Sequence, residues 1–164
     1  MASSQRASTD ETFLAQLAAE LRVVRLEAVV VGNVASILSG APVLTQNVDL
    51  LVRDTVLNRK KLKKLALAMG GVGPAPISDL ATTERIYGAD VPIDILYDQL
   101  VGGLAWASIR ARAYRAAVGR EVLLVAALAD VIASKTAAGR PKDKAVLPML
   151  RDTLAVRRAA KLEP

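Results

Sequence analysis

Two apolar stretches of the sequence each carry a single aspartate, Asp49 in the first and Asp94 in the second. Asn47 precedes Asp49 by two residues, and residues two apart on a strand project to the same face. A carboxylate on a buried strand is costly unless it is paired or binds a metal ion. Phosphoryl-transfer enzymes use such carboxylates to hold Mg²⁺, or Mn²⁺ in its place. Asn47, Asp49 and Asp94 are therefore candidate metal ligands.

The same carboxylates have a purely structural interpretation. Asp49 and Asp94 could lie at strand ends, where each would bond to backbone groups or pair with a basic residue such as Arg53. In that case, replacing Asp49 with Ala should destabilise the fold.

A third polar feature is the pair Gly32 and Asn33, which follows an apolar strand-like run and precedes a short helix-like run. A small residue at such a junction lets backbone N–H groups approach a phosphate. An ordinary tight turn gives the same pattern.

The composition excludes several kinds of chemistry. The 164 residues include no Cys and no His, which excludes thiol nucleophiles, imidazole catalysis and the usual zinc sites. The 22 Lys and Arg against 16 Asp and Glu give a net charge of +6, which favours polyanionic partners such as nucleotides or nucleic acid. Only 3% of the residues are aromatic, so a base-stacking platform is not expected.

Hydrophobic periodicity places these residues on particular elements. The Ser8 and Glu11 spacing is that of a capping box before the first helix, and Gly73, Pro74 and Pro76 indicate a loop. The expected helices cover about 10–24, 33–38, 57–69, 105–112, a segment around 128–135, and 145–161. The expected strands cover 28–31, 48–52, 84–87, 92–97, 114–118 and 121–125, with the last four forming two antiparallel pairs.

These elements predict one α+β domain over 1–164. It consists of an N-terminal helix (1–27), a sheet-containing core (28–126) and a C-terminal helical part (127–164). Polar residues interrupt the longest uncharged run, so we expect no membrane span and no membrane partner, and the absence of Cys fits a cytoplasmic location.

Several short runs occur together in an order that resembles the nucleotidyltransferase superfamily with a DNA-polymerase-β-like fold. The likeness is greatest to the small bacterial AbiEii-type toxin group. The runs are VVGN at 30–33, SGAP at 39–42, TQNVDL at 45–50 and IASKTAAGRPKD at 132–143. The family pattern is Gly followed by Gly, Ser or Asn, then Thr-x-Asp-hydrophobic-Asp, then a third Asp on a later strand. Gly32 and Asn33 match its first element, Asp49 the second carboxylate and Asp94 the third.

The resemblance implies a mixed sheet flanked by helices, with further helices at the C-terminus. It also implies transfer of a nucleoside monophosphate from an NTP to a hydroxyl of RNA, such as tRNA, or of a protein. Mg²⁺ would be the cofactor, and a cognate antitoxin would be a possible partner. Lys135 and Asp143 match family positions that meet the triphosphate and hold that region, whereas without the resemblance they could be a solvated helix residue and a helix cap.

The sequence departs from the family pattern at Asn47, where the first metal-binding Asp is expected. An amide oxygen can ligate Mg²⁺ but brings no negative charge, so activity should be weakened or lost while nucleotide binding could survive. A degenerate natural member, an altered substrate class and a deliberate inactivating substitution all explain this residue. The alternative function is therefore an inactive module that binds nucleotide, RNA or a protein partner.

Two basic regions are further candidates for contact with RNA, although a charged helix face is usually just solvated. One region comprises Arg59, Lys60, Lys61, Lys63 and Lys64, and the other comprises Arg110, Arg112, Arg115 and Arg120.

Overall fold

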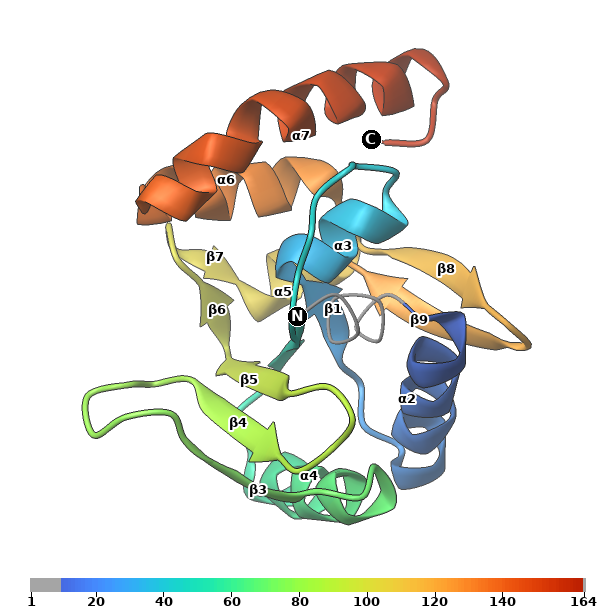
Figure 1. Cartoon of the computed structure of the whole chain (residues 1–164), viewed down its shortest axis with the longest axis vertical. Coiled ribbons are helices and arrows are strands. Elements are labelled where there is room, and N and C mark those ends of the chain that lie inside the picture. Colours follow the sequence, from blue (N-terminus) through green and yellow to red (C-terminus); the bar gives the residue numbers. More distant parts are fainter. Residues whose placement is uncertain (1–9, 164) are drawn as a thin grey trace.

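A seven-stranded mixed sheet with helices on both faces forms the centre of the protein (Figure 1). The structure, a computed structural model, describes residues 10–163. The strand order is β3-β4-β5-β2-β1-β9-β8, and a separate two-stranded ladder pairs β6 with β7. The strands are β1 (Val29–Val31), β2 (Val48–Val52), β3 (Val72–Pro76), β4 (Glu84–Tyr87), β5 (Ile93–Tyr97), β6 (Gln99–Leu100), β7 (Leu104–Ala105), β8 (Tyr114–Val118) and β9 (Glu121–Val125).

The helices divide between the two faces of the sheet. In the view of Figure 1, α3, α6 and α7 lie toward the top, and α4 lies at the bottom with α2 beside it. The helices are α2 (Glu11–Val24), α3 (Gly32–Leu38), α4 (Val56–Ala68), α5 (Trp106–Arg112), α6 (Leu128–Ala138) and α7 (Pro141–Ala159). This arrangement confirms the expected α+β class with C-terminal helices.

The core explains why the central strands are so apolar. Strand β2 lies inside the sheet between β1 and β5, and Val48, Leu50 and Val52 on one of its faces are fully buried. Helices α2 and α4 pack against each other and contribute buried residues such as Leu17 and Leu62. A strand covered on both faces needs apolar side chains nearly throughout, so the polar side chain of Asp49 in the middle of the sheet stands out.

Two of the sequence-based expectations for secondary structure are wrong. The expected loop around Gly73 to Pro76 is strand β3, an edge strand that pairs only with β4, and an edge position tolerates Pro because no second neighbour needs its N–H. The last helix begins at Pro141 rather than near Ala145, because Pro fits the first turn of a helix.

The start of the first helix also differs from the expected capping box. Ser8 lies outside the described residues. Helix α2 begins at Glu11, and the carboxylate of Asp10 caps it by accepting a hydrogen bond from the Thr12 backbone N–H.

The helices over residues 10–163 include none that combines the length and the apolar composition needed to cross a membrane.

Candidate functional site

Three charged side chains lie in one row across three adjacent strands. In the strand registers, Arg85 of β4 is opposite Asp94 of β5, and Asp94 is opposite Asp49 of β2. Side chains at directly opposed positions project from the same face of a sheet. The fold therefore brings together the two carboxylates that the sequence separates by 45 residues, and it adds an arginine beside them.

Asn47 directly precedes strand β2, which carries Asp49, and joins the two carboxylates. Its Nδ2 donates hydrogen bonds to Asp49 Oδ1 at 2.7 Å and to Asp94 Oδ2 at 3.1 Å. One nitrogen atom thus reaches both side chains, which shows how close together the two carboxylates lie. A carboxylate at position 47 could not make these bonds, because it has no hydrogen to donate unless it is protonated.

Gly32, the first residue of α3, lies directly against Asp49. A Cβ atom added at Gly32 would overlap Asp49 Oδ2, and the φ angle of Gly32 is +64°, a conformation that residues with side chains rarely adopt. Burial, and next the neighbouring Asp94 charge, raise the pKa of Asp49 to about 6. Asp49 is therefore packed closely against α3. Burial and the nearby charge of Asp94 destabilise its ionised form.

Arg85 forms a two-pronged ion pair with Asp94. Its Nε donates to Asp94 Oδ1 at 2.5 Å and its Nη2 donates to Asp94 Oδ2 at 2.9 Å. The hydrogen bond to Asp94 raises the pKa of Arg85, and the charge of Asp94 adds to this effect. Asp94 is thus paired as the structural interpretation expected, although its partner is Arg85 and not Arg53, which lies over the ring of Trp106.

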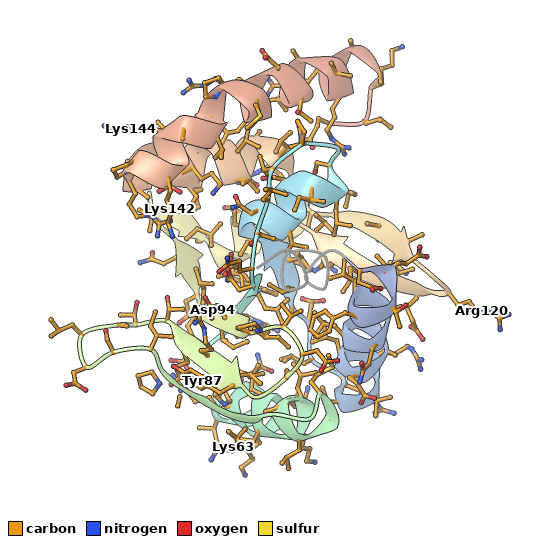
Figure 2. The ribbon with its side chains drawn as sticks, in the orientation of Figure 1. Lys63, Tyr87, Asp94, Arg120, Lys142 and Lys144 are labelled. Carbon is orange, nitrogen blue, oxygen red and sulfur yellow. The ribbon has the colours of Figure 1, made fainter. Side chains whose placement is uncertain are left out.

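A cavity of about 690 Å³ opens over these side chains. The sheet supplies one wall with Asn47, Asp49, Asp94 and Arg85, and residues at the junction of α6 and α7 supply another. In Figure 2, Lys142 at the start of α7 lies above Asp94 in the sheet. Basic side chains at this junction that line the cavity are Lys135, Arg140 and Lys142.

Lys135 and Asp143 form a buried pair in this second wall. Lys135 Nζ lies 3.5 Å from Asp143 Oδ1, and the two side chains are 12% and 1% exposed. Arg140 Nε donates to the other oxygen of Asp143 at 2.6 Å. Burial lowers the pKa of Lys135, with Asp143 opposing this effect. Lys135 is therefore not a solvated helix residue.

Asp143 stays charged despite its burial. Burial opposes the charged form, but hydrogen bonds and charge from Arg140, together with those from Lys135, outweigh it and hold the pKa of Asp143 below its ordinary value. Asp143 makes no cap for α7, since no side chain caps that helix and Asp143 points its carboxylate to the two basic residues. Asp143 thus positions Lys135 at the cavity wall.

Asn33 lines the cavity beside Gly32 and has one unused polar atom. Its Nδ2 donates to the backbone oxygen of Leu44 at 3.3 Å, while its Oδ1 is buried with no hydrogen-bond partner in the structure. A buried acceptor without a partner is unusual and often marks a place where a ligand or water binds.

The side chains around Asp49 fit one divalent ion. Carboxylate and amide oxygens are the ligands that Mg²⁺ prefers. Asp49 and Asp94 lie close enough to share the Nδ2 donor of Asn47, and the Asn47 amide would have to turn its Oδ1 toward them to serve as a third ligand. The described residues contain no group of three or more acidic, His or Cys side chains that could hold a metal ion. The site therefore offers two carboxylates and one amide to such an ion.

The cavity thus contains every residue that the sequence singled out for chemistry, namely Gly32, Asn33, Asn47, Asp49, Asp94, Lys135 and Asp143. The sequence did not single out Arg85. Its only signal was its place in a strand that was expected to pair with the strand of Asp94, and the register of that pair is not visible in the sequence.

Comparison with solved structures identifies similar folds. The solution structure of the antibiotic-resistance factor ANT(2'')-Ia aligns with a TM-score of 0.63 at 13% identity, over 93% of this chain and 90% of that one. The crystal structure of ANT(2'')-Ia in complex with adenylyl-2''-tobramycin gives the same TM-score and identity over 94% of both chains. A candidate nucleotidyltransferase from Thermotoga maritima aligns with a TM-score of 0.59 at 14% identity, over 84% of this chain and 89% of that one.

No protein-family model and no curated protein sequence matches this chain. The structural likeness shows that the protein has a nucleotidyltransferase-like fold.

Proposed function

We propose that this protein transfers a nucleoside monophosphate from an NTP to a hydroxyl group of an acceptor. The observation that carries the proposal is the cavity in which Asp49 and Asp94 on the sheet face Lys135 on α6. Nucleotidyl transfer needs carboxylates that can hold a divalent ion and basic side chains that can neutralise the charge of the triphosphate. The cavity places both kinds of side chain opposite each other. The nucleotidyltransferase-like fold supports the same reaction.

Asp49 and Asp94 are the proposed ligands of Mg²⁺, with Asn47 as a neutral third ligand. When bound, Mg²⁺ would neutralise phosphate charge and favour ionisation of the attacking hydroxyl. In the reaction, the hydroxyl oxygen bonds to the α-phosphorus, pyrophosphate leaves, and Asp94 is the proposed acceptor of the hydroxyl proton. Mn²⁺, with similar ligand preferences, is the natural substitute for Mg²⁺.

The phosphates would lie between α3 and the junction of α6 and α7. Gly32 and Asn33 at the start of α3 line this part of the cavity. Lys135 would neutralise phosphate charge, and Asp143 would hold Lys135 in place. Since burial lowers the pKa of Lys135, a bound phosphate would stabilise its charged form.

The proposed acceptor is a hydroxyl of RNA, such as tRNA, or of a protein, with a role like that of bacterial AbiEii-type toxins and a cytoplasmic location. A cognate antitoxin belongs to the same proposal. ANT(2'')-Ia was solved with adenylyl-2''-tobramycin, so a small hydroxyl-bearing molecule is a further acceptor to assay.

Activity should depend on the charge at position 47. We expect the wild-type chain to be a slow enzyme and Asn47→Asp to be faster, because it restores a third carboxylate for metal binding. The test is transfer of label from each of the four NTPs to tRNA, total protein and small-molecule acceptors. Asp49→Asn should abolish transfer in either background while the protein stays folded.

The matched control is Gln46→Glu, which adds the same charge one residue away at an exposed position. It should leave transfer unchanged. If Asn47→Asp and wild type both transfer no label to any acceptor while circular dichroism shows intact folding, the proposed reaction is wrong.

One observation favours a second function, that of a binding module without transferase activity. In the structure Asn47 and Arg85 already donate hydrogen bonds to both oxygens of Asp94 and to Oδ1 of Asp49. A module would bind nucleotide, RNA or a protein partner with the same affinity in Mg²⁺ and in EDTA. Binding that is tighter in Mg²⁺ and depends on Asp49 instead supports the enzyme, and isothermal titration calorimetry distinguishes the two.

A further inference from the structure

Arg85 binds both carboxylate oxygens of Asp94 at once. The guanidinium uses Nε on Oδ1 and Nη2 on Oδ2, a bidentate geometry that is stronger and more directional than a single ion pair. Asp94 is only 8% exposed, and what remains accessible faces the cavity. Arg85 and Asn47 together therefore donate three hydrogen bonds to the carboxylate of Asp94.

The strand register fixes Arg85 in this place. Arg85 and Asp94 are directly opposed across the antiparallel pair β4 and β5, and the pairs on either side of them keep the same register. The side chain of Arg85 is 32% exposed and lines the cavity, so its charge also faces any bound anion. Its third nitrogen, Nη1, makes no hydrogen bond to any residue between 10 and 163 and is free to donate to a ligand.

The charges around Asp94 leave little room for two divalent ions. Two-metal sites of phosphoryl transfer hold their ions about 3.5–4 Å apart, with shared carboxylates to offset the repulsion. Here Asn47 supplies no charge, and Arg85 adds a positive charge next to one of the two carboxylates. A second divalent ion at Asp94 would meet the guanidinium at short range with no further carboxylate to offset it.

We propose that Arg85 takes the place of a second divalent cation, so that the cavity binds its nucleotide with a single divalent ion beside Asp49. This inference rests on the proposed function. Arg85 becomes a positioning residue that holds Asp94 and offers Nη1 to the ligand. The site then differs from the family pattern in two ways, by the neutral Asn47 in place of an Asp and by the positive charge of Arg85. One lost negative charge and one added positive charge together suit a site with one ion fewer.

The test counts bound Mn²⁺ by electron paramagnetic resonance in the complex with a non-hydrolysable ATP analogue. Two Mn²⁺ ions about 4 Å apart broaden each other's signal through dipolar coupling, whereas a single bound ion does not. We expect one uncoupled Mn²⁺ per chain in the wild type. Arg85→Met, which removes the charge and keeps the length, should bind two coupled ions, and Arg85→Lys, which keeps the charge, should bind one.

The matched control is Arg22→Met. Arg22 also forms a two-pronged pair, with Glu121, but it lies outside the cavity, so one uncoupled ion is expected. If Arg85→Met does not fold, Arg85→Gln replaces it, because Gln keeps a donor for Asp94 without the charge. A coupled ion pair in the wild type, or one uncoupled ion in the neutral Arg85 variant, overturns the inference.

The same samples separate this inference from the proposed function. Calorimetry with the ATP analogue measures nucleotide binding on its own. Binding of nucleotide with a coupled ion pair in the wild type overturns only the role of Arg85, whereas no binding at all overturns both proposals.

Discussion

Asp49 is held where it is by the absence of a side chain on its neighbour. Its carboxylate lies against Gly32, and the left-handed φ of Gly32 begins α3 at the point where the helix meets the sheet. Position 32 therefore requires Gly for two reasons. Its φ angle is left-handed, and a Cβ atom there would overlap the carboxylate of Asp49. A substitution there tests both the fold and the placement of the carboxylate.

Gly32→Ala should displace Asp49 and weaken nucleotide binding. The left-handed φ alone costs about 1–2 kcal/mol for a residue with Cβ, and the overlap with the carboxylate adds about 1–3 kcal/mol of overpacking. Urea unfolding measures the loss of stability, and calorimetry with ATP measures the loss of affinity.

Gly103→Ala is the matched control for this substitution. Gly103 has a similar φ of +71°, and a Cβ there would meet nothing within 4 Å. Gly103→Ala should lose only about 1–2 kcal/mol of stability, which is what the left-handed φ costs, and it should bind ATP as the wild type does. Equal effects of the two substitutions on ATP binding would show that the overlap with Asp49 is unimportant.

At the residue scale, the site could be predicted where local pattern was enough. Asp49 and Asp94 could be found because a carboxylate in an apolar strand is costly, and Asn47 because residues two apart share a face. Arg85 could not be found in this way, since an Arg in a short strand next to turns is ordinary. Its role depends on register, which the sequence does not determine.

At the element scale, the junction between α6 and α7 determines one wall of the cavity. Lys135 near the end of α6 and Arg140 before α7 share the carboxylate of Asp143. The opposite end of α6 is held as well, because Glu163 Oε1 accepts a hydrogen bond from the backbone N–H of Leu128 and pairs with Arg157 of α7. Both ends of α6 are thus tied to α7 or to the residues that follow it.

Asp143→Asn should destabilise the protein at neutral pH by about 3 kcal/mol, because it leaves buried Lys135 without its partner. The pKa of Asp143 is lowered in the folded state, so its stabilisation is present above its ordinary pKa of 3.8 and is lost as the pH falls through the lower folded value. The difference between wild type and variant should therefore shrink below about pH 4. Urea unfolding from pH 7 to pH 3 measures it.

Asp152→Asn is the control, because Asp152 is exposed on the same helix. Its stability should follow that of the wild type at every pH. A difference between wild type and Asp143→Asn that stays constant down to pH 3 would contradict the ionised pair.

Most elements of the fold could be predicted from the sequence, because short apolar runs, helical periodicity and glycine breaks agree for β2, β8, β9 and α4. Strand β3 could not, because Gly73, Pro74 and Pro76 are typical of a loop and form a strand only at the edge of a sheet whose order is not known in advance. The two-residue strands β6 and β7 are too short to give a periodic pattern.

At the scale of the whole molecule, some basic side chains are paired within the protein and others are exposed and unpaired among residues 10–163. Arg59 pairs with Asp54 and Glu84, and Lys61 donates to the backbone oxygen of Arg25. Lys60, Lys63 and Lys64 remain exposed on α4. In Figure 2, Lys63 lies at the outer edge of the molecule, well away from Asp94. If RNA is the acceptor, this helix face can bind its backbone outside the cavity.

Replacing Lys60, Lys63 and Lys64 together with Gln should weaken RNA binding if RNA is the acceptor. Each lost phosphate contact lowers the slope of log K against log salt by about 0.7–0.9, so three should lower it by about 2–3. Binding of tRNA at several salt concentrations measures this slope, and calorimetry should show unchanged ATP binding.

Replacing Arg115 and Arg120 with Gln provides the comparison. Both are exposed on the hairpin of β8 and β9, and Figure 2 places Arg120 at its tip, far from Lys63. A slope that falls with this pair and not with the three lysines would move the RNA surface to the hairpin. A slope unchanged in both variants would remove RNA as the acceptor.

The two hydrogen bonds of Asn47 also bear on how such a site changes over generations. Codons for Asn and Asp differ by a single base, and the two side chains have the same shape. Asn at position 47 binds two carboxylates that an Asp would repel, so the exchange toward Asn gains stability while it removes charge from the site. A lineage with this fold can therefore lose or regain a carboxylate in one heritable step, and we expect the form with the amide to be the more stable one.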